Sequence, residues 1–272
     1  MNPFILSAPK EEMPEASGHW YRRDGSACHS VPAKDGTPRG INIRWDRGLN
    51  LVPSVTTVLQ VISKPALEKW KQDQMILAAL TLERLPEEPD SLFLKRLRED
   101  GFKSASDAAK EGTAVHDALE QYFKGEVYPA KYTEHCKGVD AEIKRLFPDV
   151  TDWAAEVGFA HPLGFGGRVD LHSPSIGCVV DFKGKEGDFT DGKTLAYDQH
   201  YQLAAYQMGL NLPKAEAANI FFSRTHPGVV KGHKWTLEKM ETGRQIFLKA
   251  LELWGLVKNY DPSFKLFDKD IR

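Results

Sequence analysis

The stretch GGRVDLHSPSIGCVVDFKGK, residues 166–185, contains two runs of alternating side chains separated by a turn that holds Pro174 and Gly177. Successive side chains of a strand point to opposite faces. In the second run one predicted face therefore consists of Ile176, Cys178, Val180 and Phe182. The opposite face consists of Val179, Asp181 and Lys183. The pattern predicts two paired strands, with a carboxylate and an ammonium group on one side of the second.

The same alternation predicts the faces of the first run. It places Arg168, Asp170 and His172 together, opposite Val169 and Leu171. Because the two strands are expected to pair, the carboxylates of Asp170 and Asp181 and the ammonium of Lys183 can converge.

The segments on either side extend these strands into a sheet. Residues 153–162, WAAEVGFAHP, predict a third strand that completes a β-meander. Downstream, a helical pattern precedes an apolar strand, a hairpin-like return and a long amphipathic helix, at residues 197–210, 217–224, 229–237 and 237–260. Strands interleaved with helices favour an α/β fold with a central mixed sheet flanked by helices.

The residues before this core predict a small β-rich cap followed by helices. Aromatic or aliphatic residues alternate with charged ones around turn signals in residues 19–60, and residues 1–50 are assigned to the cap. Residues 53–80 carry helical spacing, with Pro65 in the first turn of a second helix. A second helical pair follows, its last helix beginning at Ser104 or Ser106 and ending at Gly125, and a helix is expected over 133–147. We expect one domain over 1–272.

Composition excludes several classes of protein. The 272 residues are 41% hydrophobic and 27% charged, which is typical of a folded globular chain. With 36 Lys and Arg against 38 Asp and Glu, the net charge of −2 provides no global attraction to polyanions. Three distant cysteines support neither disulfides nor a zinc or iron–sulfur site. Without a signal segment or a long apolar run, we expect a cytoplasmic protein with no membrane contact.

The converging acids suggest a metal site. Mg²⁺ prefers carboxylate oxygens, and phosphodiester hydrolysis needs a cation to neutralise the phosphate and acidify water. Asp170 and Asp181 could anchor that cation, and Lys183 could orient the nucleophile or stabilise developing negative charge. Taken alone, however, Asp181 and Lys183 are equally an exposed pair on an amphipathic strand, and His116 a surface or capping residue of a helix.

Five short motifs occur in one order: GTAVH at 112–116, the acid of AAEVGF at 154–159, GRVD at 167–170, DFK at 181–183 and QLAAY at 202–206. This ordered set resembles the RecB-like branch of the PD-(D/E)XK nucleases over roughly residues 50–210. PSVTTVL at 53–59 followed by LEKW at 67–70 is similar to the mitochondrial genome maintenance exonucleases and related phage exonucleases.

The resemblance implies a restriction-endonuclease-like core over 51–272, with its C-terminal helix, and gives a role to each motif. Its metal ligands are His116, Asp170, Asp181 and the backbone carbonyl of Phe182. Its other catalytic residues are Lys183 and the upstream acid Glu156, while Gln202 and Tyr206 brace the site and contact DNA. Mg²⁺ is the expected cofactor and Mn²⁺ should substitute. No iron–sulfur cluster is expected because the C-terminal cysteine group is missing, and no nucleotide cofactor because there is no Walker A motif.

We therefore expect a metal-dependent DNA exonuclease of phage or bacterial recombination, repair or replication, acting on DNA that is single-stranded or has free ends. A recombination or single-strand-binding protein would be its partner, in the cytosol of a bacterium or a phage-infected host. The alternatives are a structure-specific or restriction-type endonuclease, an inactive DNA-binding accessory protein, and a hydrolase of another phosphate ester.

Overall fold

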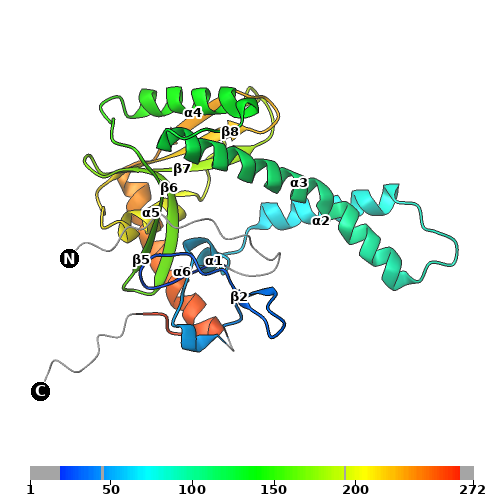
Figure 1. The fold of residues 1–272 in the computed structure, drawn as a ribbon. Helices are drawn as coiled ribbons and strands as arrows, with labels where there is room; N and C mark the ends of the chain where they lie inside the picture. The colour runs from blue at the N-terminus through cyan, green and yellow to red at the C-terminus, as the bar shows by residue number, and fades with distance from the viewer. Residues whose placement is uncertain (1–18, 44–45, 193, 264–272) are drawn as a thin grey trace, which may run out of the picture.

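A five-stranded mixed sheet lies at the centre of the protein (Figure 1) in the order β5-β6-β7-β8-β9. The computed structural model describes residues 19–43, 46–192 and 194–263. The strands are β5 (Ala154–His161), β6 (Phe165–Ser173), β7 (Cys178–Lys185), β8 (Glu216–Ser223) and β9 (Val230–Lys234). β5, β6 and β7 form the predicted antiparallel meander, β8 pairs in parallel with β7, and β9 is antiparallel to β8.

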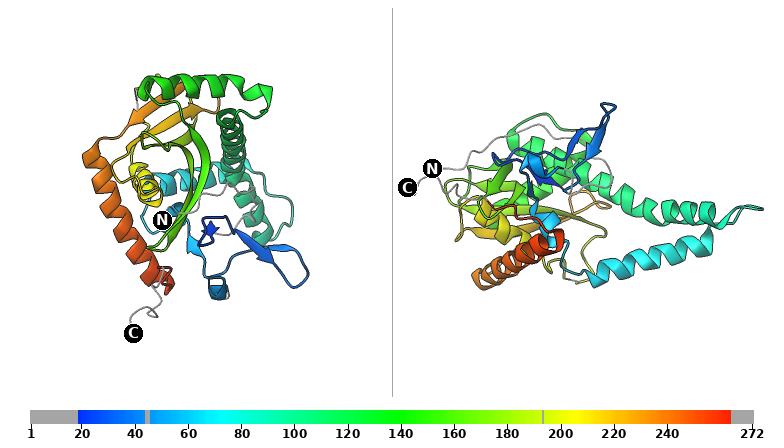
Figure 2. Two further views of the ribbon diagram at one scale, coloured as in Figure 1. Left: turned by 60° about the vertical axis from the view of Figure 1, so that its left-hand side comes forward. Right: turned by 90° about the horizontal axis from the view of Figure 1, so that it is seen from below.

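Helices cover both faces of the sheet, as the two views of Figure 2 show. On one face α3 (Asp90–Lys124) and α4 (Thr133–Leu146) cover a core that includes Leu119, Ile143 and Phe182. On the other face α1 (Val55–Leu59), α5 (His200–Gly209) and α6 (Leu237–Lys258) cover a core that includes Leu203 and Phe247. The prediction of an α/β fold with a central mixed sheet flanked by helices is confirmed.

Helix α3 differs from the prediction. It is one continuous helix of 35 residues rather than a pair, so the expected start at Ser104 or Ser106 is wrong. Alanines at 105, 108 and 109 favour helix strongly enough to carry it through the serines. Its end is as predicted, because Gly125 adopts the left-handed conformation, with φ 71°. The helix α2 (Pro65–Thr81) runs beside α3 in an arm that projects from the body (Figure 1).

The N-terminal segment shares the main core. β1 (Trp20–Tyr21) pairs with β4 (Val52–Pro53), and β2 (Ser30–Pro32) with β3 (Pro38–Gly40). Trp20 is buried against Trp254 of α6, with ring centroids 6.0 Å apart. Short 3₁₀ helices lie at Arg47–Leu49 and Ala130–Tyr132. Residues 1–18 and 44–45 of the predicted cap lie outside the described residues.

The alternation predicted for β7 is confirmed, but that for β6 is wrong. Val179 packs in the core under α5 and α6, whereas Cys178, Val180 and Phe182 pack under α3 and α4. In β6, Val169 belongs to the first core and Leu171 to the second, so the faces exchange at Asp170. Arg168, Asp170 and His172 therefore do not share a face.

The cause is a local distortion in two adjacent strands. Ala155 pairs with Leu171 and Val157 with Val169, which leaves Glu156 opposite Asp170. Glu156 has a φ of 56°, a left-handed conformation that strands normally exclude. β6 pairs with β7 only over Leu171–Ser173, so the two strands separate at Asp170.

In the described ranges, no helix combines the length and the apolar character that crossing a lipid bilayer requires.

Candidate active site

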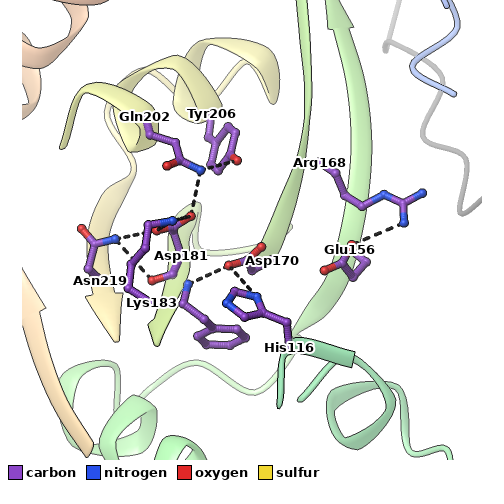
Figure 3. A network of polar contacts seen from close by, with 10 residues as sticks. His116, Glu156, Arg168, Asp170, Asp181, Lys183, Gln202, Tyr206 and Asn219 are labelled. Atoms are coloured by element: carbon purple, nitrogen blue, oxygen red, sulfur yellow. Dashed lines mark hydrogen bonds and ion pairs between the residues drawn. The ribbon is translucent and has the colours of Figure 1, made fainter. Parts of the chain in front are cut away.

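Asp181 forms the buried centre of a polar cluster near the middle of β7 (Figure 3), with 1% of its side chain exposed. Lys183 Nζ lies 2.8 Å from Oδ1 and 2.7 Å from Oδ2. Gln202 Nε2 donates to Oδ1 at 3.0 Å, and Asn219 Nδ2 donates to Oδ2 at 2.7 Å. Burying a carboxyl group is costly unless it is paired and hydrogen-bonded, and these three donors supply those interactions.

A second hydrogen bond fixes the orientation of Asn219. The indole Nε1 of Trp235 donates to Asn219 Oδ1 at 2.7 Å, and an indole can only donate. The amide oxygen must therefore face Trp235, which leaves the amide nitrogen facing Asp181. Neither Asn219 nor Trp235 was among the predicted site residues. The one available signal was a polar residue, Asn219, inside an apolar strand.

Gln202 and Tyr206, four residues apart on α5, lie together above Asp181 in Figure 3. Gln202 Nε2 contacts both the Tyr206 hydroxyl, at 2.6 Å, and Asp181. Burial, followed by the negative charges of Asp181 and Asp170, raises the pKa of Tyr206 well above its ordinary value. The phenol therefore stays neutral and acts as a hydrogen-bonding group.

Lys183 is held in its charged form. Burial alone would lower its pKa, but attraction to Asp181 and then Asp170, with the hydrogen bond to Asp181, raises it above 10.5. With 30% of the side chain exposed, the ammonium lies at the boundary between the buried carboxylate and solvent. It can therefore stabilise negative charge that approaches from outside.

The side chain of Asp170 substitutes for a backbone hydrogen bond that is missing where β6 and β7 separate. Its Oδ2 accepts from the amide N–H of Phe182 at 2.7 Å. His116 of α3 approaches the same oxygen, with Nδ1 at 3.7 Å. The Asp170 side chain is 15% exposed and the His116 side chain is 26% exposed. The strand separation thus directs a carboxylate between two strands and leaves it accessible.

The upstream acid Glu156 lies on the other side of Asp170 in Figure 3. Arg168 Nη1 is 3.4 Å from Glu156 Oε2. Strained backbone at a non-glycine residue persists only where the surrounding structure enforces it, and such strain concentrates at functional sites. The φ of 56° at Glu156 is therefore an independent indication that this region is a functional site.

The donor types suit a hard divalent cation, since Asp170 and Asp181 supply carboxylate oxygens and His116 an imidazole. In the described parts of the chain, however, no group of three or more His, Cys, Asp and Glu side chains is arranged to hold a metal. Asp181 faces its three side-chain donors, so binding a cation there requires Lys183 to move aside. The metal-ligand roles of His116, Asp170, Asp181 and the Phe182 carbonyl remain predictions.

A cavity of about 630 Å³ opens beside Asp170. One part of its lining carries the carboxylates of Asp117, Glu156 and Asp170. Another part carries Tyr21 and Ser54, from the N-terminal segment. Two of the predicted catalytic acids, Glu156 and Asp170, thus border a space large enough for a small organic molecule.

Comparisons with known proteins give distant similarities. No protein-family model matches the chain, and no curated protein does. Among solved structures, a "putative exonuclease" from Eubacterium rectale is 13% identical, with a TM-score of 0.39, and the match covers 55% of this chain and 68% of that one. The protein SSO0001 is 12% identical, with a TM-score of 0.28, and the match covers 69% of this chain and 86% of that one. Neither similarity assigns an activity to this chain.

Proposed function

We propose that the protein is a metal-dependent deoxyribonuclease, with exonuclease action favoured over endonuclease action. The observation that carries the proposal is the convergence of His116, Asp170 and the Asp181–Lys183 pair from three separate elements, α3, β6 and β7. Two acids, a charged lysine and an imidazole at the point where β6 and β7 separate form a set suited to phosphodiester hydrolysis.

Different side chains of the protein have different roles in the proposed reaction. The carboxylates of Asp170 and Asp181, with His116, would hold a Mg²⁺ or Mn²⁺ ion. When bound, such an ion supplies neutralisation of the phosphate charge and a lower pKa for water. Lys183 rests its ammonium on Asp181 with 30% of its side chain exposed, and would stabilise the negative charge that grows on the phosphate oxygens. Asn219 holds the Asp181 carboxylate in place from behind.

Gln202 and Tyr206 link the site to helix α5. Gln202 Nε2 donates to Oδ1 of Asp181, which fixes that oxygen, and the same nitrogen contacts the Tyr206 hydroxyl. The neutral Tyr206 hydroxyl can also accept or donate to a DNA strand. We extend the proposal to DNA with free ends as substrate, and to phage or bacterial recombination, repair or replication as its setting. A single-strand-binding or recombination protein in the cytosol would be the partner.

The test is digestion of end-labelled linear and circular DNA with Mg²⁺, Mn²⁺ or EDTA. Wild type should shorten linear DNA from an end only with a metal, leaving 5′-phosphate and 3′-hydroxyl products. Lys183→Ala should lower the rate by about 10²–10³-fold, as expected when one group that stabilises the transition-state charge is removed.

Lys234→Ala is the matched control. Lys234 also lies on a strand, with 36% of its side chain exposed and an ion pair of 2.7 Å, to Glu216. Its loss should leave the rate unchanged. Cleavage of covalently closed circles would replace exonuclease by endonuclease action. Binding of DNA without cleavage in the presence of either metal would contradict the nuclease proposal and favour a DNA-binding accessory protein.

A further inference from the structure

We propose that the cavity beside Asp170 is a pocket for one nucleobase of the DNA strand whose phosphate lies at Asp170. The proposal rests on the proposed nuclease function and adds a substrate contact to it. The cavity lies between the N-terminal segment, α3, β6 and α5 and borders the predicted catalytic acids.

The cavity has the size of a small-molecule site. Its volume of about 630 Å³ falls within the range of roughly 300–1,000 Å³ typical of pockets that enclose an organic ligand. Its lining is more apolar than polar. This character suits a planar ring with a few polar edges better than it suits a charged backbone.

The chemistry changes along strand β6. A side chain at Gly166 would lie 2.9 Å from Tyr21 Cβ, so Tyr21 is packed directly on the backbone of that glycine. Ser54 bridges to the same residue. Gly166 precedes Asp170 by four residues, or about 13 Å of strand. The backbone position on which Tyr21 packs is thus displaced along the strand from Asp170 by a length that a base and its sugar can span.

The part near Gly166 carries no formal charge on its aromatic rings. Burial raises the pKa of Tyr21 far above its ordinary value, so the phenol stays neutral. The Tyr21 ring packs edge-on against His29, with centroids 5.5 Å apart. Ser54 and Thr56 add hydroxyl groups that can donate or accept. Tyr21 is 5% exposed and backs the wall, whereas the exposed His19 and Thr56 supply a ring and a hydroxyl on which a base of any sequence can stack and form edge contacts.

The acidic residues of the lining determine which portion of the DNA strand enters the cavity. Glu156, Asp117 and Asp170 line the cavity together with one cation, Arg168, which lies 3.4 Å from Glu156. Three acids against one cation leave this part negative, so a second phosphate inside the cavity would be repelled. The uncharged portion of a nucleotide avoids that repulsion. The charges therefore favour entry of a base, with its phosphate left at Asp170.

The first experiment measures digestion of oligonucleotides in which one base is removed, at each position near the digested end in turn. With wild type, loss of the base at one position should lower kcat/KM by about tenfold, the factor expected for one stacked base. Equal rates at all positions would overturn the proposal.

Variants at the mouth of the cavity connect that effect to the structure. Thr113 is an exposed residue of α3 that lines the cavity, and its hydroxyl donates to the carbonyl of Ala109. Thr113→Trp should fill the mouth and abolish the difference between intact and base-free substrates. Thr242→Trp is the control, because Thr242 is an exposed α6 residue that makes the same bond, to Glu238. Thr242→Trp should keep the tenfold difference between intact and base-free substrates. A Thr113→Trp protein that also keeps this difference would contradict the proposal.

A binding measurement separates this proposal from the nuclease assignment. Calorimetry with Mg²⁺ should show dAMP binding to the full chain, at least tenfold more tightly than deoxyribose 5-phosphate, and Thr113→Trp should remove the preference. If the protein cuts no DNA but shows this preference, the base pocket is supported and the proposed nuclease function is contradicted. Equal binding of both compounds overturns the pocket, whatever the outcome for activity.

Discussion

Replacing Lys183 with Met should destabilise the fold by about 2 kcal/mol. Methionine keeps most of the side-chain volume, so the change removes chiefly the charge. Breaking a fully buried ion pair costs about 3–5 kcal/mol, whereas exposed pairs contribute about 0–1 kcal/mol. Lys183 lies between these limits, with 30% of its side chain exposed while Asp181 is buried. Asp181 also retains the hydrogen bonds from Gln202 and Asn219.

The dependence on pH identifies the ion pair as the cause. The pKa of Lys183 in the folded protein is raised above 10.5, its ordinary value. The contribution of the pair is therefore fully present below about pH 10.5 and is lost as the pH rises through the folded-state pKa. Between pH 6 and 9 the difference in stability between wild type and variant should be constant, and above pH 10.5 it should shrink.

Urea unfolding followed by tryptophan fluorescence gives these differences directly. The wild type and the variant share every other titrating group, so their difference isolates Lys183. Lys234→Met, the control with two partly exposed partners, should cost at most about 0.5 kcal/mol. A Lys183→Met protein as stable as wild type, or a difference that grows above pH 10.5, would refute the reasoning.

Three further changes test separate parts of the site. Glu156→Gly should be about 1 kcal/mol more stable than Glu156→Ala, because both lose the carboxylate and only glycine fits the φ of 56° without strain; urea unfolding that ranks alanine above glycine would contradict the left-handed backbone. Trp235→Phe removes the donor that orients Asn219 and should lower the DNA cleavage rate about tenfold with the circular-dichroism spectrum unchanged, while an unaltered rate would show that Asn219 needs no such support. Mn²⁺ should bind more tightly to Lys183→Met than to wild type in calorimetry, because the ammonium no longer competes for Asp181, and weaker binding would count against Asp181 as a ligand.

Local sequence patterns predicted the parts of the fold that depend on local physics. Alternation in β7 correctly separated Val179 from Val180, because that strand is regular and buried on both faces. Gly125 ended its helix because the left-handed position after a helix favours glycine. The alternation of strands and helices predicted a central mixed sheet, and the parallel pairing of β7 with β8 is what makes the observed sheet mixed.

The remaining features depend on contacts distant in the sequence. Nothing within residues 165–173 indicates that the faces exchange at Asp170, because the exchange needs Glu156 opposite it and the separation from β7 beside it. Asn219 was missed for the same reason. Its role is set by Asp181, 38 residues away, and by Trp235, which is 16 residues away.

The distortion of the sheet and the position of the candidate site have one physical origin. Where β6 and β7 separate, the amide of Phe182 loses its place in the regular ladder, and an unpaired buried amide would cost about 1–3 kcal/mol. The carboxylate of Asp170 accepts that hydrogen bond and is thereby fixed between the strands. The bond uses one oxygen of an acid that stays 15% exposed, within 3.7 Å of His116. Asp170 therefore both closes the defect in the sheet and directs negative charge toward the cavity, which is why the acid lies where the sheet is irregular.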